Sequence, residues 1–152
     1  MNAIPSNPSP DTATRAQTDF LSQLALHIGV PVDSGFSLIA PHVVKGPAGL
    51  ACRFHLHAER AAVLPEVLLP MAAQELAGAE VLKLLTLQAA ILKEFGGYLG
   101  ASAEGLLQLS SLSWIESPQD AATAMDMLNS LGVRVLQALV DEAVPASAPA
   151  SA

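Results

Sequence analysis

The chain has 152 residues, with 7 basic against 14 acidic side chains and a formal net charge of -7. This length predicts one domain, and the acidic balance argues against nucleic-acid partners, because binding a phosphate backbone needs clustered lysine and arginine. The apolar runs are too short for the ~18 residues of a membrane span, so no membrane insertion is expected. A signal peptide is not evident, and the single Cys52 cannot form an internal disulfide. The expected compartment is therefore a reducing cytoplasm.

Both ends of the chain are rich in proline, serine and alanine. Segments of that composition cannot bury an apolar core. We therefore expect disordered tails at residues 1–11 and 144–152, and a single domain at residues 12–143.

The first predicted helix spans Arg15–Ile28. Thr12 or Thr14 can cap its start, and Gly29 can end it. Its apolar residues fall on one face, which indicates a short helix that packs on a flat surface.

Three strands are predicted next. The first covers residues 36–40, and the turn-forming residues 45–49 separate it from the second, at residues 50–58. The second has the clearest alternation in the chain. Its predicted inward residues are Leu50, Cys52, Phe54 and Leu56, and its outward residues are Ala51, Arg53, His55 and His57. Pro65 and Pro70 bracket the third strand, residues 63–71, and place it at a sheet edge.

A second helix is predicted at residues 80–95, with Gly96 and Gly97 as its stop. It carries two apolar stripes, whereas a surface helix needs one. One stripe can pack on the protein's own sheet. The natural cover for the other is a second copy of the chain, with a deeper core of the same chain as the alternative. The predicted homodimer interface consists of Val81, Leu85, Gln88, Leu92, Phe95, Tyr98 and Trp114.

Two more strands, residues 98–103 and 106–115, flank a tight turn at Glu104 and Gly105. Ser117 caps a final helix that extends to about residue 143. The order is helix, three strands, helix, two strands, helix. The fold class predicted is α+β, with a twisted antiparallel sheet of about five strands and three helices.

The sequence offers no catalytic motif, and we expect neither an enzyme nor a cofactor. His55 and His57 share a strand face and, with His42, could hold a metal, but no carboxylate or thiol of suitable spacing joins them. We therefore predict no metal site and a solvated or partner-facing histidine surface. Cys52 is expected to be a buried, inert thiol.

The first helix is too short to cover the first three strands. An apolar groove is therefore expected between them, where an extended peptide could seat alternate side chains and pair with a strand edge. The alternative is that these residues form ordinary sealed core. The predicted groove residues are Phe20, Leu24, Ile28, Phe36, Leu38, Phe54, Leu56 and Leu68.

The pattern resembles the class I type III secretion chaperones, the family of the Tir chaperone of enteric pathogens. The resemblance covers about residues 15–143. It rests on FLSQLALHIGVPV, in the first predicted helix and its exit, and on LLTLQAAI in the second predicted helix with GGYLGASAEGLLQLSSL in the hairpin that follows. Gln88 stands where many members carry asparagine, and the proline-bracketed third strand is unusual. The resemblance implies a small acidic cytoplasmic homodimer that binds the N-terminal segment of secreted effectors and keeps them competent for export without ATP. It leaves the secretion ATPase as a further candidate partner.

Two other functions remain open from the residues. One is a small α+β domain that binds a hydrophobic ligand, and the other is an enzyme that uses the histidines. The alanine-rich surface favours a broad-specificity chaperone over a dedicated one.

Overall fold

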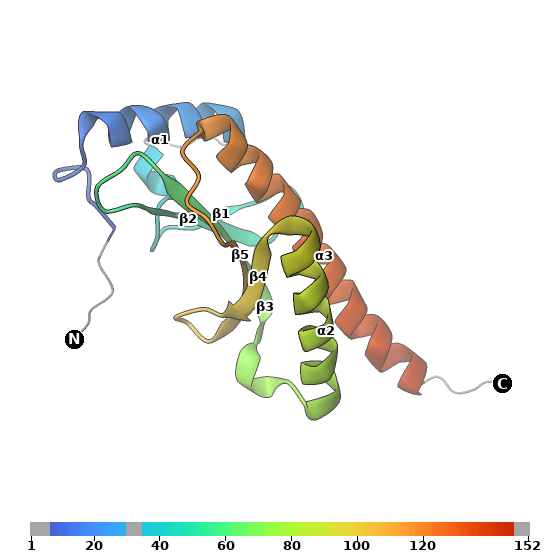
Figure 1. Ribbon diagram of the computed structural model, residues 1–152. Coiled ribbons are helices and arrows are strands. Elements are labelled where there is room, and N and C mark those ends of the chain that lie inside the picture. The colour runs from blue at the N-terminus through green and yellow to red at the C-terminus, as the bar shows by residue number, and fades with distance from the viewer. Residues whose placement is uncertain (1–6, 30–34, 148–152) are drawn as a thin grey trace.

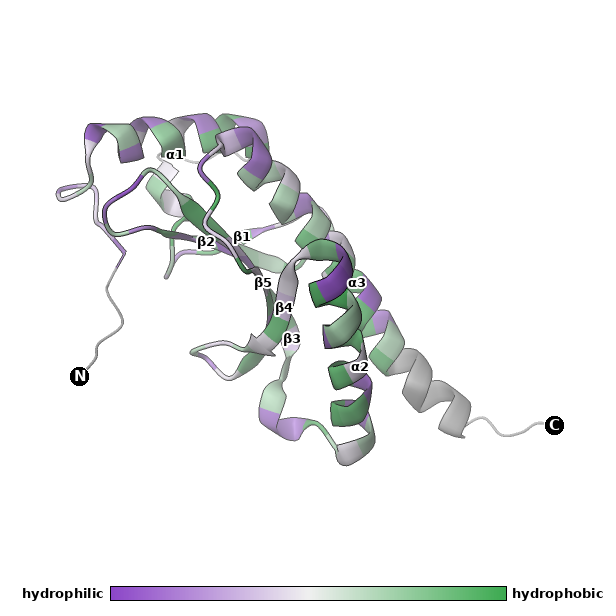
Figure 2. Cartoon of the chain, in the orientation of Figure 1, coloured by the Kyte–Doolittle hydropathy of each residue, from purple (hydrophilic) through white to green (hydrophobic). Residues whose placement is uncertain are grey.

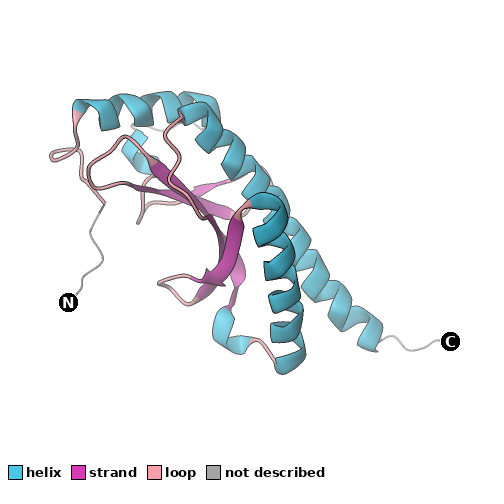
Figure 3. Cartoon of the chain, viewed as in Figure 1, coloured by secondary structure: helices cyan, strands magenta, loops and turns pink. Residues whose placement is uncertain are grey.

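The computed structural model describes residues 7–29 and 35–147. Its helices are α1 (Arg15–Ile28), α2 (Gly78–Phe95) and α3 (Pro118–Ser147), and its strands are β1 (Val44–Lys45), β2 (Ala51–Leu56), β3 (Val63–Ala72), β4 (Gly97–Ala101) and β5 (Leu106–Ser111) (Figures 1 and 3). Short 3-10 helices lie at Gly35–Leu38 and Ala73–Glu75. None of the helices in the described ranges is long and apolar enough to cross a bilayer.

The five strands form one antiparallel sheet in the order β1-β2-β3-β5-β4. Helix α3 packs on β3, β5 and α1, and α2 packs on β4 and the side of α3 (Figure 1). The predicted α+β class, with three helices and a five-stranded antiparallel sheet, is confirmed. The predicted tails at residues 1–6 and 148–152 lie outside the described residues.

Local signals explain where α1 and α2 begin and end. The Thr14 hydroxyl accepts a hydrogen bond from the Gln17 N–H, and the Gln17 side chain accepts one from the Thr14 N–H, which is a capping box. The Glu80 carboxylate accepts the Ala77 N–H at the start of α2. Gly29 and Gly96 end the two helices at φ 77° and 65°, a left-handed conformation that glycine adopts without strain.

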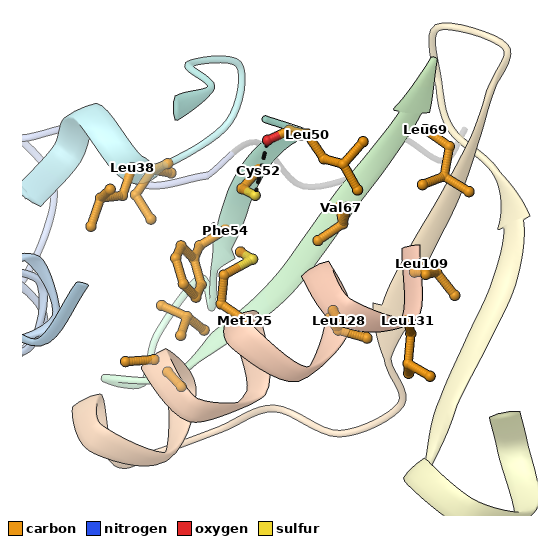
Figure 4. Packing of buried hydrophobic residues seen from close by; sticks show 14 of the residues in the cluster. Leu38, Leu50, Cys52, Phe54, Val67, Leu69, Leu109, Met125, Leu128 and Leu131 are labelled. Carbon is orange, nitrogen blue, oxygen red and sulfur yellow. Dashed lines mark hydrogen bonds between the residues drawn. The ribbon is translucent and has the colours of Figure 1, made fainter. Parts of the chain in front are cut away.

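The core lies between one face of the sheet and α1 and α3. Even-numbered residues of β2 point into it, as the alternation predicts, and Phe54 is only 1% exposed. In Figure 4 the side chains of α3 lie over those of the strands. The principal members are Cys52, Phe54, Leu56, Val67, Leu109, Met125, Leu128 and Leu131.

Two of the predicted strands are placed incorrectly. Residues 36–40 do not form a strand, because Gly35–Leu38 is a 3-10 helix in which Leu38 is fully buried. The first strand is instead the two-residue β1. The third strand, β3, is wrongly predicted at an edge: it is the middle strand, paired with β2 and β5.

The prolines of β3 fit a central strand because each stands where the ladder on the β5 side is interrupted. Val63 exchanges hydrogen bonds with Ile115 on that side, so Pro65, two residues on, has its nitrogen on the same side. The β3–β5 pairing ends at Glu66 and Ser110, so it does not include Pro65. Pro70 lies in the register shift of the β3–β5 pairing, where a missing N–H is tolerated.

Described residues lie on both sides of the predicted domain, residues 12–143. Helix α3 continues to Ser147, past the predicted end near residue 143. Residues 7–11 belong to the described part, and Asn7 bonds to strand β2. The domain boundaries and the disordered tails stay a prediction.

Candidate functional site

Helix α2 has an apolar face that the rest of the described chain leaves uncovered. Leu84 and Ile91 face inward and are 8% and 4% exposed. The opposite side carries large apolar side chains at helical spacing, which we call the α2 stripe; Figure 2 shows how hydrophobic this helix is. The α2 stripe consists of Val81 (42% exposed), Leu82 (67%), Leu85 (61%) and Leu92 (48%).

The other residues of the predicted dimer interface have partners within the chain. Gln88 is half-buried, and its side-chain oxygen accepts a hydrogen bond from the Leu99 N–H, which ties α2 to β4. Phe95 is half-buried against the core. The Tyr98 hydroxyl accepts a hydrogen bond from the Gln108 side-chain amide at 3.3 Å. Trp114 packs edge-on against His57 on the β2–β3 hairpin, with ring centroids 5.0 Å apart. The interface itself stays a prediction.

The predicted groove between α1 and the first three strands is filled. Its residues Phe20, Leu24, Leu38, Phe54 and Leu56 are all buried core, in agreement with the sealed-core alternative. Leu68 pairs with Ala51 on the opposite face of the sheet. Helix α1 is short, as predicted, but α3 covers the part of the sheet that α1 does not reach.

What remains accessible near the predicted groove is its rim. Ile28 and Phe36 are half-buried. Ile28 borders a hollow of about 240 Å³, which Phe54 and Met125 line with apolar groups. Asp126 and Lys45 supply charged groups at its border.

The sheet face that turns away from α1 and α3, which we call the outer face, carries an unexpected charged cluster. Arg53 is 5% exposed. Its Nε donates to Glu66 Oε1 at 2.5 Å, and its two terminal nitrogens donate to the two oxygens of Glu104 at 2.8 and 3.0 Å. His55 Nε2 lies 3.1 Å from the same Glu66 oxygen. The Arg53 guanidinium thus bridges two carboxylates.

These contacts change the acidities of the cluster. The hydrogen bonds from Arg53 lower the pKa of Glu104 to about 2. Burial would raise the pKa of Glu66, but hydrogen bonds from His55 and Arg53 outweigh it, so its pKa lies below the ordinary value. The Glu104 hydrogen bond raises the pKa of Arg53. Glu66 and Glu104 therefore remain ionised in a cluster that holds the β4–β5 turn on the outer face.

The alternation of β2 predicted that Arg53 points away from the core, but not that it is buried. Its cross-strand partner Glu66 is the one charged residue in the otherwise apolar strand β3. A single charge in such a strand could have suggested an ion pair with Arg53 on the neighbouring strand. Glu104 lies 51 residues away in the chain, so nothing in the local pattern indicates its contact.

The histidines serve the local structure. His57 Nδ1 accepts hydrogen bonds from the N–H groups of Glu59 and Arg60, and so closes the turn between β2 and β3. His42 follows the 3-10 helix in a loop, not on a strand. Within residues 7–29 and 35–147, no three histidine, cysteine, aspartate or glutamate side chains gather as a metal site would require.

Cys52 is buried, as predicted, and lies against Asn129 of α3. The Asn129 amide donates to Cys52 Sγ at 3.1 Å and to the Met125 carbonyl at 3.0 Å. Burial raises the pKa of the Cys52 thiol, although the Asn129 hydrogen bond works against this effect. The thiol is therefore protonated near neutral pH, which is the state of an unreactive core cysteine.

No family model, curated protein or solved structure matches the chain. The surfaces and contacts described above, together with the sequence pattern, are therefore the basis for assigning a function.

Proposed function

We propose that the chain is a homodimeric type III secretion chaperone of class I. In this role it binds the N-terminal segment of secreted effector proteins in the bacterial cytoplasm and keeps them competent for export. The chain performs no chemistry of its own; it supplies surfaces. The observation that carries the proposal is the α2 stripe.

The α2 stripe places four exposed large apolar side chains on one helix. Leu85 lies one turn after Val81, and Leu92 lies two turns after Leu85, so the three follow one line along the helix. Contiguous apolar patches on a monomer usually mark an interface. A two-fold axis across α2 would pack the stripe of one protomer on the stripe of the other. The burial of each leucine would then contribute twice to the free energy of dimerisation.

The client surface in this proposal lies at the rim of the core, because the interior of the predicted groove is filled. Ile28 and Phe36 are accessible in part. The adjoining edge of β2 is paired with β1 over two residues and with Ile39 at Phe54, and its end at Leu56 lies beyond both. An extended segment can gain main-chain hydrogen bonds at such an edge and set apolar side chains in the neighbouring hollows.

Affinity capture from the native cytoplasm, followed by mass spectrometry, identifies candidate clients. Each candidate is then divided into an N-terminal fragment and the remainder, and binding of each piece to the purified chain is measured by calorimetry. The proposal predicts that the N-terminal fragment binds at one segment per two chains. Clients that bind only through their remaining parts would contradict it.

The hollow beside Ile28 favours a second candidate, a domain that binds a small hydrophobic ligand. Its volume of about 240 Å³ falls just below the range of roughly 300–1,000 Å³ that is usual for such ligands. Native mass spectrometry of the purified chain tests this directly. A retained small molecule, lost when Met125→Glu fills the hollow with charge, would favour this candidate over the chaperone.

A further inference from the structure

The N-terminal segment, residues 7–10, lies at the end of strand β2, on the edge that faces away from β3. Asn7 Oδ1 accepts a hydrogen bond of 2.7 Å from the backbone N–H of Leu56. The next residue, His57, donates its N–H to the Ala62 carbonyl on the β3 side. Because successive N–H groups of a strand point to opposite sides, the Leu56 N–H points away from β3. On that side, β1 pairs with the first two residues of β2 and Ile39 forms a bridge with Phe54, so Leu56 lies beyond the paired part of this edge.

A side-chain oxygen thus occupies a position where a neighbouring strand would place a backbone carbonyl. Further back along this edge, the Phe54 carbonyl accepts the Ala40 N–H at 2.9 Å. The Leu56 N–H is the next main-chain group on the edge. Pro8 and Pro10 have no N–H to donate, and the Ser9 N–H and carbonyl form hydrogen bonds within residues 9–13. The Asn7 side chain therefore supplies their hydrogen bond to this edge.

Asn7 also separates two hollows. One, of about 370 Å³, reaches Arg53 and His55 on the outer face, and the other, of about 230 Å³, reaches Phe36 and Ile39. Both are lined by Asn7 and by the same two loop residues, Ala40 and Pro41. Movement of Asn7 away from β2 would enlarge both hollows next to the Leu56 N–H.

The segment is fixed at its other end, so Asn7 can leave without disturbing α1. The Ser9 carbonyl accepts the N–H groups of Thr12 and Ala13 at 3.1 and 2.9 Å. Thr14 then caps the helix through Gln17. This turn anchors residues 9–14 to α1, and the contact with the β2 edge depends on Asn7 ahead of it.

We propose that residues 7–10 are a placeholder on the client-binding edge. An extended client segment displaces Asn7, and a client backbone carbonyl then accepts the Leu56 N–H. This inference rests on the proposed function for its class of client and adds a regulatory step at the same surface. Because the hydrogen bond between Asn7 and the Leu56 N–H must first be broken, client affinity is lowered by roughly three- to tenfold. That factor is the equivalent of one net hydrogen bond.

The test compares three full-length proteins: the natural chain, Asn7→Ala and Asn7→Asp. Alanine removes the acceptor of the Leu56 N–H, whereas aspartate keeps an oxygen in that position and is the matched control. Hydrogen exchange at the Leu56 amide is measured by NMR. Affinity is measured for a permanently unfolded polypeptide, reduced and carboxymethylated α-lactalbumin.

Asn7→Ala is expected to speed Leu56 exchange and to tighten binding of the unfolded polypeptide, each by roughly three- to tenfold, while Asn7→Asp stays close to the natural chain. Unchanged exchange in Asn7→Ala overturns the placeholder, because Asn7 then does not protect the edge. Faster exchange with unchanged affinity also overturns it, yet leaves the proposed function standing. Absence of binding by all three proteins counts against both.

Discussion

Arg53 and Glu104 are joined by two parallel hydrogen bonds, from Nη1 to Oε2 at 2.8 Å and from Nη2 to Oε1 at 3.0 Å, although 51 residues separate them in the chain. A bidentate pair of this kind fixes orientation as well as distance. It holds the β4–β5 turn against β2 across the outer face of the sheet. Glu66 completes the arrangement by accepting from Arg53 Nε.

Glu104→Gln should lower the free energy of unfolding at neutral pH by up to about 1 kcal/mol, a modest amount because half of the Glu104 side chain is exposed and solvent screens the pair. Unfolding by urea at pH 7 measures it. Exposed Glu75→Gln serves as the control and should have little effect. Equal urea midpoints for Glu104→Gln and the natural chain would contradict the role given to this contact.

The same variant should change the response to acid. The pKa of Glu104 is lowered to about 2 in the folded chain, against about 4.3 for an unperturbed glutamate. Its contribution to stability is therefore present above pH ~4.3 and is lost as the pH falls toward ~2. Urea midpoints of the natural chain should fall more steeply over this window than those of Glu104→Gln. Parallel curves would show that Glu104 is not the group that titrates.

Phe54→Ala should destabilise the chain by about 3–5 kcal/mol, because the ring is 1% exposed and its removal leaves a cavity in the core. Urea unfolding measures the loss, with Leu26→Ala, 81% exposed on α1, as the control. Any loss of client binding in Phe54→Ala should track unfolding. Full stability combined with lost binding would show that Phe54 belongs to an accessible groove after all.

His57→Ala should release Trp114, the only tryptophan of the chain, from its edge-on contact. The indole is 39% exposed already, and loss of the histidine ring should expose it further. Tryptophan emission should shift to longer wavelength, with stronger quenching by iodide. His55→Ala is the comparison, since His55 contacts Glu66 and not Trp114. Identical emission from both variants would contradict the contact.

The three helices and the second strand could be predicted because their signals are local. Thr14, Gly29 and Gly96 mark helix ends within a few residues of the apolar stripes they bound. Residues 36–40 were wrongly predicted as a strand because their apolar residues fit an alternating pattern. Leu38 and Ile39 are adjacent and both buried, which a turn of 3-10 helix allows and a half-buried strand does not.

The candidate surfaces were predictable to different degrees. Two apolar stripes on one helix are visible in the sequence, and the structure leaves Leu85 and Leu92 uncovered. The groove could not be judged locally, because α3, a hundred residues after α1, is what fills the space beside it. The Arg53 cluster and the Asn7 contact with Leu56 join distant segments, which no spacing pattern reports.

We propose that the α2 stripe is the interface of a homodimer. Light scattering coupled to size exclusion should give about 31 kDa for the natural chain, twice its 15.7 kDa. Leu85→Glu should give monomers or aggregates, because each buried leucine is worth about 1.5–3 kcal/mol and the two-fold axis doubles the loss. Leu26 on α1 is more exposed than Leu85, 81% against 61%, and Leu26→Glu should remain a dimer. A natural chain of 15.7 kDa, or an unchanged, well-behaved dimer in Leu85→Glu, would contradict the account.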